Sequence, residues 1–132
     1  PAIASFPKNP TKNINIYESF SLKYYIEAVE YIKKNVENPS FFIFSDDPVW
    51  ATKNLESKLS SPTYYVKTNS KLSPVDTLQL MSMCKHFIIT NSTFGWWSAQ
   101  ISKNKDSIVI APKRWYKNKK NLDIIPNNWI KF

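Results

Sequence analysis

Hydroxyl and amide side chains gather where a predicted helix begins, in the second half of the chain. Asn91, Ser92 and Thr93 follow the apolar stretch 86–89 and precede Phe94. A helix that starts there leaves backbone N–H groups without helical partners, and its dipole is positive at that end. Such groups bind phosphate in many nucleotide-binding α/β proteins. The same residue types also cap helices. The pattern alone therefore favours phosphate binding and simple capping about equally.

Carboxylates stand at two other predicted junctions between a strand and a helix. Asp46 and Asp47 follow the apolar run 41–44, and Asp76 stands three residues after Ser73. Asp76 completes a capping box with Ser73, which is its simplest role, but near a nucleotide it would accept hydrogen bonds from a base or ribose. The aspartate pair fits a helix cap with a solvated neighbour, or acid/base or metal groups. Because nothing near the pair completes a ligand set, we predict no metal site.

The single histidine and the single cysteine do not indicate catalysis. His86 stands at the start of a predicted strand, away from the functional edge of the sheet, so we interpret it as a packing or turn residue. That position argues against a Ser-His-Asp or Cys-His arrangement. Cys84 is alone, which excludes an internal disulfide and argues against a cysteine-based metal site.

Helices and strands must alternate to position these residues. Helical spacing of apolar side chains begins at Ser21 and is stopped at Asn38-Pro39. Strands are predicted at 41–44, 63–67, 86–89 and 107–111, with helices from Asp47 to about Leu59, from Ser73 and over 91–102. Alternation of this kind predicts a parallel sheet with right-handed crossovers. Residues 1–132 are therefore expected to form one Rossmann-like, three-layer α/β domain, with 1–20 an irregular lead-in and 112–132 a tail.

The charge of the chain indicates an anionic partner. The net charge is +8 over 132 residues, and the clearest cluster of cations lies within 113–120. A basic nucleic-acid-binding module is therefore an alternative function. No run of about 18 apolar residues is present, and the start lacks the features of a signal peptide. We expect a bacterial cytoplasmic protein, with peripheral attachment to the inner membrane as a variant.

Three longer segments resemble glycosyltransferase family 11, the α-1,2-fucosyltransferases. Residues 41–50, FFIFSDDPVW, resemble the strand-plus-SDD motif of that family. Residues 76–89, DTLQLMSMCKHFII, resemble its D-x-x-L-M-S-x-C-K-H stretch, with one more residue between the aspartate and Leu-Met-Ser. Residues 91–97, NSTFGWW, are similar to its N-S-T-F-S-W-W, and 112–115 fit the following P-x-x-W. The matches follow one another in the family's order.

The resemblance implies an enzyme that transfers L-fucose from GDP-fucose to a glycan ending in galactose. Its relatives have the two-domain GT-B fold, and this chain would be the C-terminal, donor-binding half. Asn91, Ser92, Thr93 and Phe94 would bind the diphosphate, while Asp76 would lie near the guanine or ribose, in a donor pocket that also includes Asp46 and Asp47. Such enzymes are inverting and metal-independent, so no cofactor and no nucleic acid is expected. The resemblance further implies that the enzyme takes part in membrane-associated glycan synthesis.

Two departures from the family pattern matter. The H-x-R-R-x-D motif, whose arginine pairs with the diphosphate, is absent, and the single arginine is Arg114, outside any such context. Gly95 replaces the commoner serine, which lowers helix propensity. We therefore expect an N-terminal domain to be missing here. We also expect that the chain binds GDP weakly and is inactive in transfer by itself.

Overall fold

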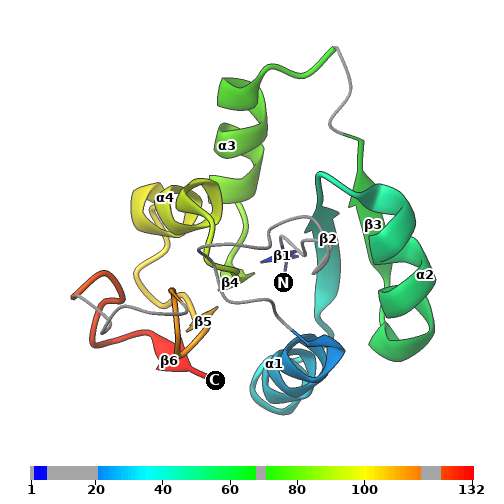
Figure 1. The fold of residues 1–132 in the computed structure, drawn as a ribbon, viewed down its shortest axis with the longest axis horizontal. Coiled ribbons are helices and arrows are strands. Elements are labelled where there is room, and N and C mark those ends of the chain that lie inside the picture. The colour runs from blue at the N-terminus through cyan, green and yellow to red at the C-terminus, as the bar shows by residue number, and fades with distance from the viewer. Residues whose placement is uncertain (1, 6–20, 68–70, 117–122) are drawn as a thin grey trace.

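The computed structural model describes residues 2–5, 21–67, 71–116 and 123–132 (Figure 1). Strands and helices alternate along most of them. The strands are β1 (Ala2–Ser5), β2 (Ser40–Phe44), β3 (Thr63–Val66), β4 (His86–Ile88), β5 (Val109–Ala111) and β6 (Ile130–Lys131). The helices are α1 (Leu22–Asn35), α2 (Pro48–Leu59), α3 (Pro74–Ser82) and α4 (Thr93–Ile101). The predicted α/β class is confirmed.

The strands of the described residues form one parallel sheet in the order β3-β2-β1-β4-β5-β6. Every neighbouring pair is parallel, with Ala4 of β1 opposite Phe42 of β2 on one side and Phe87 of β4 on the other. This is the strand order of doubly wound, dinucleotide-binding folds. The sheet is therefore consistent with the predicted Rossmann-like architecture.

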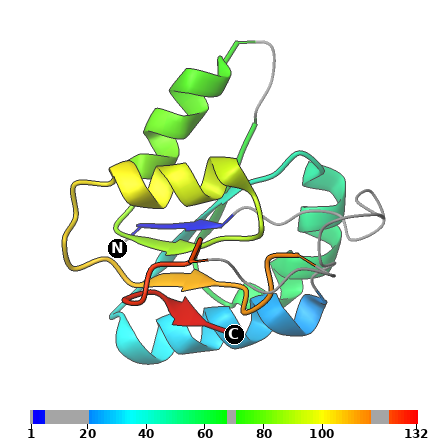
Figure 2. The same cartoon turned by 60° about the vertical axis from the view of Figure 1, so that its left-hand side comes forward.

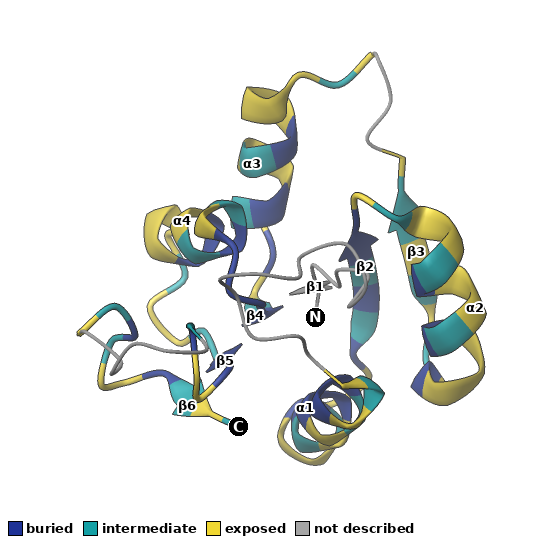
Figure 3. Cartoon of the chain, in the orientation of Figure 1, coloured by how far each residue is buried: buried dark blue, intermediate teal, exposed yellow. Residues whose placement is uncertain are grey.

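Helices cover both faces of the sheet (Figures 1 and 2). α1 and α2 contact each other on one face, and α3 and α4 contact each other on the opposite face. Successive strand residues point to opposite faces, so Ile88 packs under α1 while Phe87 and Ile89 pack under α4. Continuous apolar strands follow from this double cover. Figure 3 shows the result: β4 and β5 are largely buried, the outer strands β3 and β6 are more open, and exposed residues line the outer sides of the helices.

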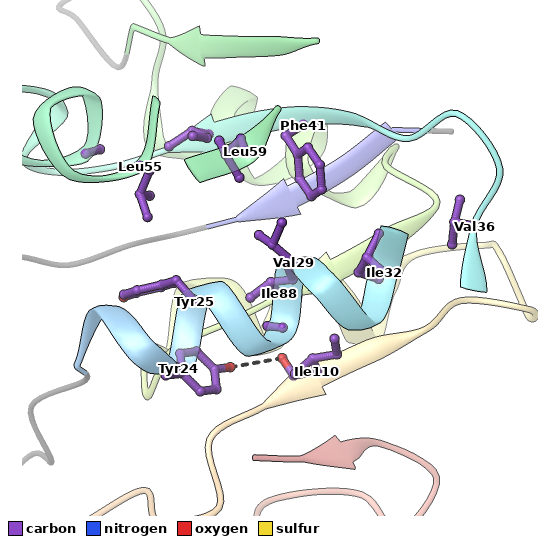
Figure 4. Close-up of a cluster of buried hydrophobic side chains, with 13 residues drawn as sticks. Tyr24, Tyr25, Val29, Ile32, Val36, Phe41, Leu55, Leu59, Ile88 and Ile110 are labelled. Carbon is purple, nitrogen blue, oxygen red and sulfur yellow. Dashed lines mark hydrogen bonds between the residues drawn. The ribbon is translucent and has the colours of Figure 1, made fainter. Parts of the chain in front are cut away.

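The α1 core is built around aromatic and branched side chains from one face of the helix. Tyr25, Val29 and Ile32 are buried, and Tyr24 and Ala28 are buried beside them. Figure 4 shows this cluster against β2, β4 and β5, with the Tyr24 hydroxyl directed at the carbonyl of Ile110.

The prediction that residues 1–20 are an irregular lead-in was wrong for Ala2–Ser5. These four residues form β1, the strand between β2 and β4. The run has only four residues and no sustained apolar period, and its β structure depends on pairing with both neighbours. The remainder of the lead-in, residues 6–20, lies outside the described residues.

Part of the predicted tail, residues 112–132, belongs to the sheet. Ile130–Lys131 forms β6 and pairs with Ile110 and Ala111 of β5. The backbone N–H of Phe132 donates to the Ala111 carbonyl at 3.1 Å, and the Lys113 N–H donates back to the Phe132 carbonyl at 2.6 Å. A two-residue strand of this kind is set by its neighbour rather than by its own composition. The chain end therefore extends the sheet.

Helix starts follow the predicted local signals. Asp47 caps α2, its carboxylate accepting the Trp50 N–H at 3.0 Å, with Pro48 as the first helical residue. Ser73 and Asp76 form the full capping box of α3. Ser21 precedes α1 but makes no side-chain capping hydrogen bond.

Candidate functional site

The strand order reverses between β1 and β4, and the residues that follow β4 define the candidate site. β1 leads through α1 to β2 on one side, whereas β4 leads through α4 to β5 on the other. Loops that leave such neighbouring strands in opposite directions open a crevice at their carboxyl ends, which is where ligands bind in open α/β sheets. Residues 90–93, here named the 90–93 turn, lie at this edge between β4 and α4.

The 90–93 turn is mostly enclosed, with an open polar end. Thr90, Asn91 and Ser92 are buried, and Thr93 is exposed. Ser92 is the N-cap of α4 in extended conformation, and its carbonyl accepts the Trp96 N–H at 3.0 Å. Its hydroxyl, however, makes no capping hydrogen bond. The amides of the first turn of α4 are therefore not occupied by their own cap.

Buried hydrogen bonds fix the turn from both sides. The Tyr24 hydroxyl of α1 donates to the Ile89 carbonyl at 2.5 Å, just before the turn. The side-chain amide of Asn91 donates to the Trp115 carbonyl at 3.1 Å. Since Asn91 is 5% exposed, its amide ties two loops together. Its predicted contact with a donor diphosphate stays a prediction.

Gly95 in the first turn of α4 allows the helix to approach β4 closely. A Cβ atom added at this position would lie 3.3 Å from Cβ and 3.4 Å from Cγ2 of Ile89. That is tighter than an ordinary van der Waals contact. The glycine that departs from the family pattern therefore sits against the strand that carries the turn.

The carboxylates after β2 lie one strand away from the strand-order reversal. β1 separates β2 from β4, so their ends are about 10 Å apart at ordinary strand spacing. Asp47 is occupied as the cap of α2, and its N–H binds the Ser45 hydroxyl at 3.0 Å. Asp46 is exposed beside it. The predicted pair thus divides into one structural and one exposed carboxylate.

Asp76 has a structural role in the described residues. Its carboxylate accepts the Ser73 hydroxyl at 2.6 Å and the Ser73 N–H at 3.1 Å, and these bonds lower the pKa of Asp76. In both views, α3 begins at its end farthest from the sheet (Figures 1 and 2). The structure thus places Asp76 on the outer end of α3, while the other predicted residues gather near the sheet edge. A nucleotide contact by Asp76 remains a prediction.

Two cations of the predicted basic cluster within 113–120 lie near the turn. Lys113 and Arg114 are exposed between the buried Pro112 and Trp115, on the loop that follows β5. Trp115 is the residue whose carbonyl binds Asn91. The P-x-x-W pattern was a signal for this loop, but its neighbourhood to the turn depends on a contact between residues 24 positions apart.

The site therefore combines a helix N-terminus, a serine hydroxyl that makes no capping hydrogen bond, and nearby positive charge. Together these groups could bind an anion. Comparison with protein families agrees with this chemistry, since the model for "Glycosyl transferase family 11" matches residues 8–132. The chain belongs to glycosyltransferase family 11.

Named relatives of this family 11 chain are longer proteins. The chain is 35% identical over 111 residues to the O-antigen biosynthesis glycosyltransferase WbnK of Escherichia coli, covering 83% of this chain and 35% of that protein. It is 34% identical over 113 residues to an alpha-1,2-colitosyltransferase of Escherichia coli, covering 83% and 38%. Galactoside 2-alpha-L-fucosyltransferase SEC1 of Bos taurus is 29% identical over 79 residues, covering 60% and 21%. The chain thus spans little more than a third of the first two relatives. No solved structure matches.

Other reactive side chains of this family 11 chain are used in packing. The His86 ring nitrogen Nδ1 accepts the Ile108 N–H at 3.0 Å, which confirms a turn contact, and burial together with Lys85 lowers the pKa of His86. Burial raises the pKa of the Cys84 thiol to about 11. Among the described residues, no three His, Cys, Asp or Glu side chains are grouped to hold a metal ion. None of the described helices is both long and apolar enough to span a bilayer.

Proposed function

We propose that this chain is the donor-binding part of a fucosyltransferase that transfers L-fucose from GDP-fucose to a galactose-terminated glycan. Family membership supports sugar transfer, and relatives named as α-1,2-colitosyl- and α-1,2-fucosyltransferases support a deoxysugar and this linkage. The chain would act with a second domain of the GT-B type, and without a metal or other cofactor.

The observation that carries the proposal is the position of the 90–93 turn. It lies at the reversal of strand order, at the N-terminus of α4, and the side chain of the N-cap residue Ser92 makes no capping hydrogen bond. Backbone N–H groups and the helix dipole stabilise a diphosphate at such a place. Ser92, Thr93 and the amide of Phe94 would bind the diphosphate, while Asn91 would hold the turn in shape.

The same interactions would assist the transfer step. The acceptor hydroxyl forms a new bond to the anomeric carbon of fucose, and the bond from that carbon to the GDP oxygen breaks. The electron pair leaves with GDP, and the hydroxyl proton passes to a base outside this chain. Because negative charge grows on the diphosphate in the transition state, donors aimed at it accelerate departure.

Calorimetry on the 132-residue chain tests donor binding. GDP is expected to bind more tightly than ADP, since the pocket is proposed to select guanine. Ser92→Ala should weaken GDP binding about fivefold, the value of one ordinary hydrogen bond. Ser61→Ala, before β3 at the opposite edge of the sheet, is the matched control and should bind as the parent does. Absence of GDP binding, or equal binding of ADP, would refute the proposal.

A transfer assay tests the division of labour. With GDP-fucose and a galactose-terminated oligosaccharide, the chain alone is expected to produce no fucosylated product. Product formation by the isolated chain would show that no second domain is required. A second assay adds the N-terminal domain of a longer family member. In that assay, GDP-fucose competes with nucleotide-activated colitose as the donor. A preference for colitose would show that the proposed sugar is wrong, but it would not contradict the proposed diphosphate site.

A further inference from the structure

The single arginine of the chain lies on a loop that is held beside the 90–93 turn. Residues 112–116, here named the 112–116 loop, follow β5, the strand next to β4. The Lys113 N–H donates to the Phe132 carbonyl at 2.6 Å, and the Trp115 carbonyl accepts the Asn91 side chain at 3.1 Å. Arg114 stands between these two attachment points. Its backbone is therefore fixed while its side chain is exposed.

The contact with Asn91 brings this backbone close to the cap of α4. Arg114 is one residue from the bonded Trp115, and Ser92 is one residue from the bonded Asn91. Consecutive Cα atoms are about 3.8 Å apart. The Cα atoms of Arg114 and Ser92 are therefore each about this distance from the Cα atom of a residue in the Asn91–Trp115 hydrogen bond. An arginine side chain is long enough to reach over such a distance.

Ser92 supplies an independent sign of a ligand at this place. The residue is 7% exposed, and its hydroxyl forms no hydrogen bond with the described residues. Among those residues, the polar side-chain atom that is fully shielded and unpaired belongs to Tyr65, not to Ser92. The Ser92 hydroxyl is thus unpaired yet still reachable from solvent. A buried hydroxyl is normally hydrogen-bonded, so an outside acceptor is the natural partner.

The positive charge at the carboxyl ends of β4 and β5 also favours binding of an anion. Arg114 forms no ion pair with a described residue, and its neighbour Trp115 is hydrogen-bonded to Asn91, one residue before the N-cap of α4, where the helix dipole is positive. The carboxylates after β2 are about three strand spacings from β5, and Asp47 is occupied in its cap. The guanidinium of Arg114, the hydroxyl of Ser92 and the N-terminus of α4 thus all belong to segments that follow β4 and β5 at the carboxyl edge of the sheet.

We propose that Arg114 binds the diphosphate of the sugar nucleotide from the side of β5, opposite the amides of α4. The inference rests on the proposed function and names a residue outside the N-S-T-F segment. A guanidinium offers paired N–H donors that match phosphate oxygens, and the bond is charge-assisted. Arg114 would also stabilise the charge that GDP gains on departure.

Calorimetry with two ligands tests this role in the full 132-residue chain. Arg114→Gln should weaken GDP binding tenfold or more, because a charge-assisted contact is lost, while guanosine binding stays unchanged. Arg114→Lys keeps the charge but not the paired donors, so its affinity for GDP should lie between those of the parent and of Arg114→Gln. Lys105→Gln, an exposed charge on the connection between α4 and β5, removes the same charge elsewhere and should match the parent.

The possible results separate the two proposals. If the parent binds GDP and Arg114→Gln behaves like Lys105→Gln, Arg114 has no such role and the proposed function stands. Equal loss of GDP and guanosine binding by Arg114→Gln would indicate a structural effect and overturn the inference. If the parent binds no GDP, both proposals are refuted. Equal binding of ADP, with a single-stranded oligonucleotide weakened as much by Arg114→Gln, would mark a general polyanion surface and refute both.

Discussion

Replacing Tyr24 with phenylalanine removes one oxygen atom from the contact between α1 and the start of the 90–93 turn. The hydroxyl donates to the Ile89 carbonyl at 2.5 Å and lies 3.4 Å from the Ile110 carbonyl. The Ile110 carbonyl keeps the Ile89 N–H at 2.9 Å, so Ile89 is the acceptor that loses a partner. An unsatisfied buried acceptor costs about 1–3 kcal/mol. We expect Tyr24→Phe to lower the free energy of unfolding by about 2 kcal/mol.

Urea denaturation measures this loss directly. With a slope of about 2 kcal/mol per molar urea, the unfolding midpoint should fall by about 1 M while the slope stays the same. Tyr31→Phe, on the same helix, is the control, since the ring of Tyr31 contacts Phe132 and no hydrogen bond of its hydroxyl is found among the described residues. It should shift the midpoint little. Equal midpoints for the two variants would refute the reasoning.

Alkaline titration gives the same contact a second readout. Burial raises the pKa of Tyr24 well above 10, with Tyr25 adding to the effect. The folded state therefore holds this proton more tightly than the unfolded state. The resulting stability is complete below pH 10 and is lost as pH rises from there toward the folded-state pKa. Tyr24→Phe should lose less stability above pH 10 than the parent. An unchanged alkaline slope would argue against the buried hydroxyl as its source.

Three further predictions concern the site and its surroundings. Asn91→Ala removes the donor to the Trp115 carbonyl and should lower the melting temperature by several degrees, for a loss of about 1–2 kcal/mol; an unchanged melting temperature would contradict the linking role. Ser73→Ala should return the pKa of Asp76 upward, because the Ser73 hydrogen bonds lower it. The parent holds that stabilisation above the unfolded-state pKa and loses it as pH falls through the lower folded-state pKa, so an unchanged carboxyl titration by NMR would refute the assignment. Cys84 should react slowly with a thiol reagent at pH 8 in the folded chain and rapidly in urea, because burial raises its pKa to about 11; fast labelling of the folded chain would contradict this.

Local signals predicted the helices well because they act over three or four residues. The Asp47-Pro48 start and the Ser73–Asp76 box are formed by neighbours in sequence, and both are present as expected. The strand at Ala2–Ser5 was missed because its pairing partners lie far along the chain. Residues 130–131 were missed for the same reason, since β5 determines their conformation.

The candidate site shows the same division between local and distant effects. The position of Ser92 at a helix start follows from the strand and helix on either side of it, and the structure places it there. The relation of Arg114 to that turn depends on a tertiary hydrogen bond between Asn91 and Trp115, which no spacing rule contains. Asp76 illustrates the opposite case. Its capping role could be predicted, but the direction of α3 away from the sheet could not.

The central position of β1 has a consequence for how the chain folds. β1 is the strand that joins the β2-β3 part of the sheet to the β4-β5-β6 part. Ala4 meets Phe87 only after more than half of the chain has been synthesised. Closing so large a loop slows folding, and until it closes the two parts present unpaired strand edges.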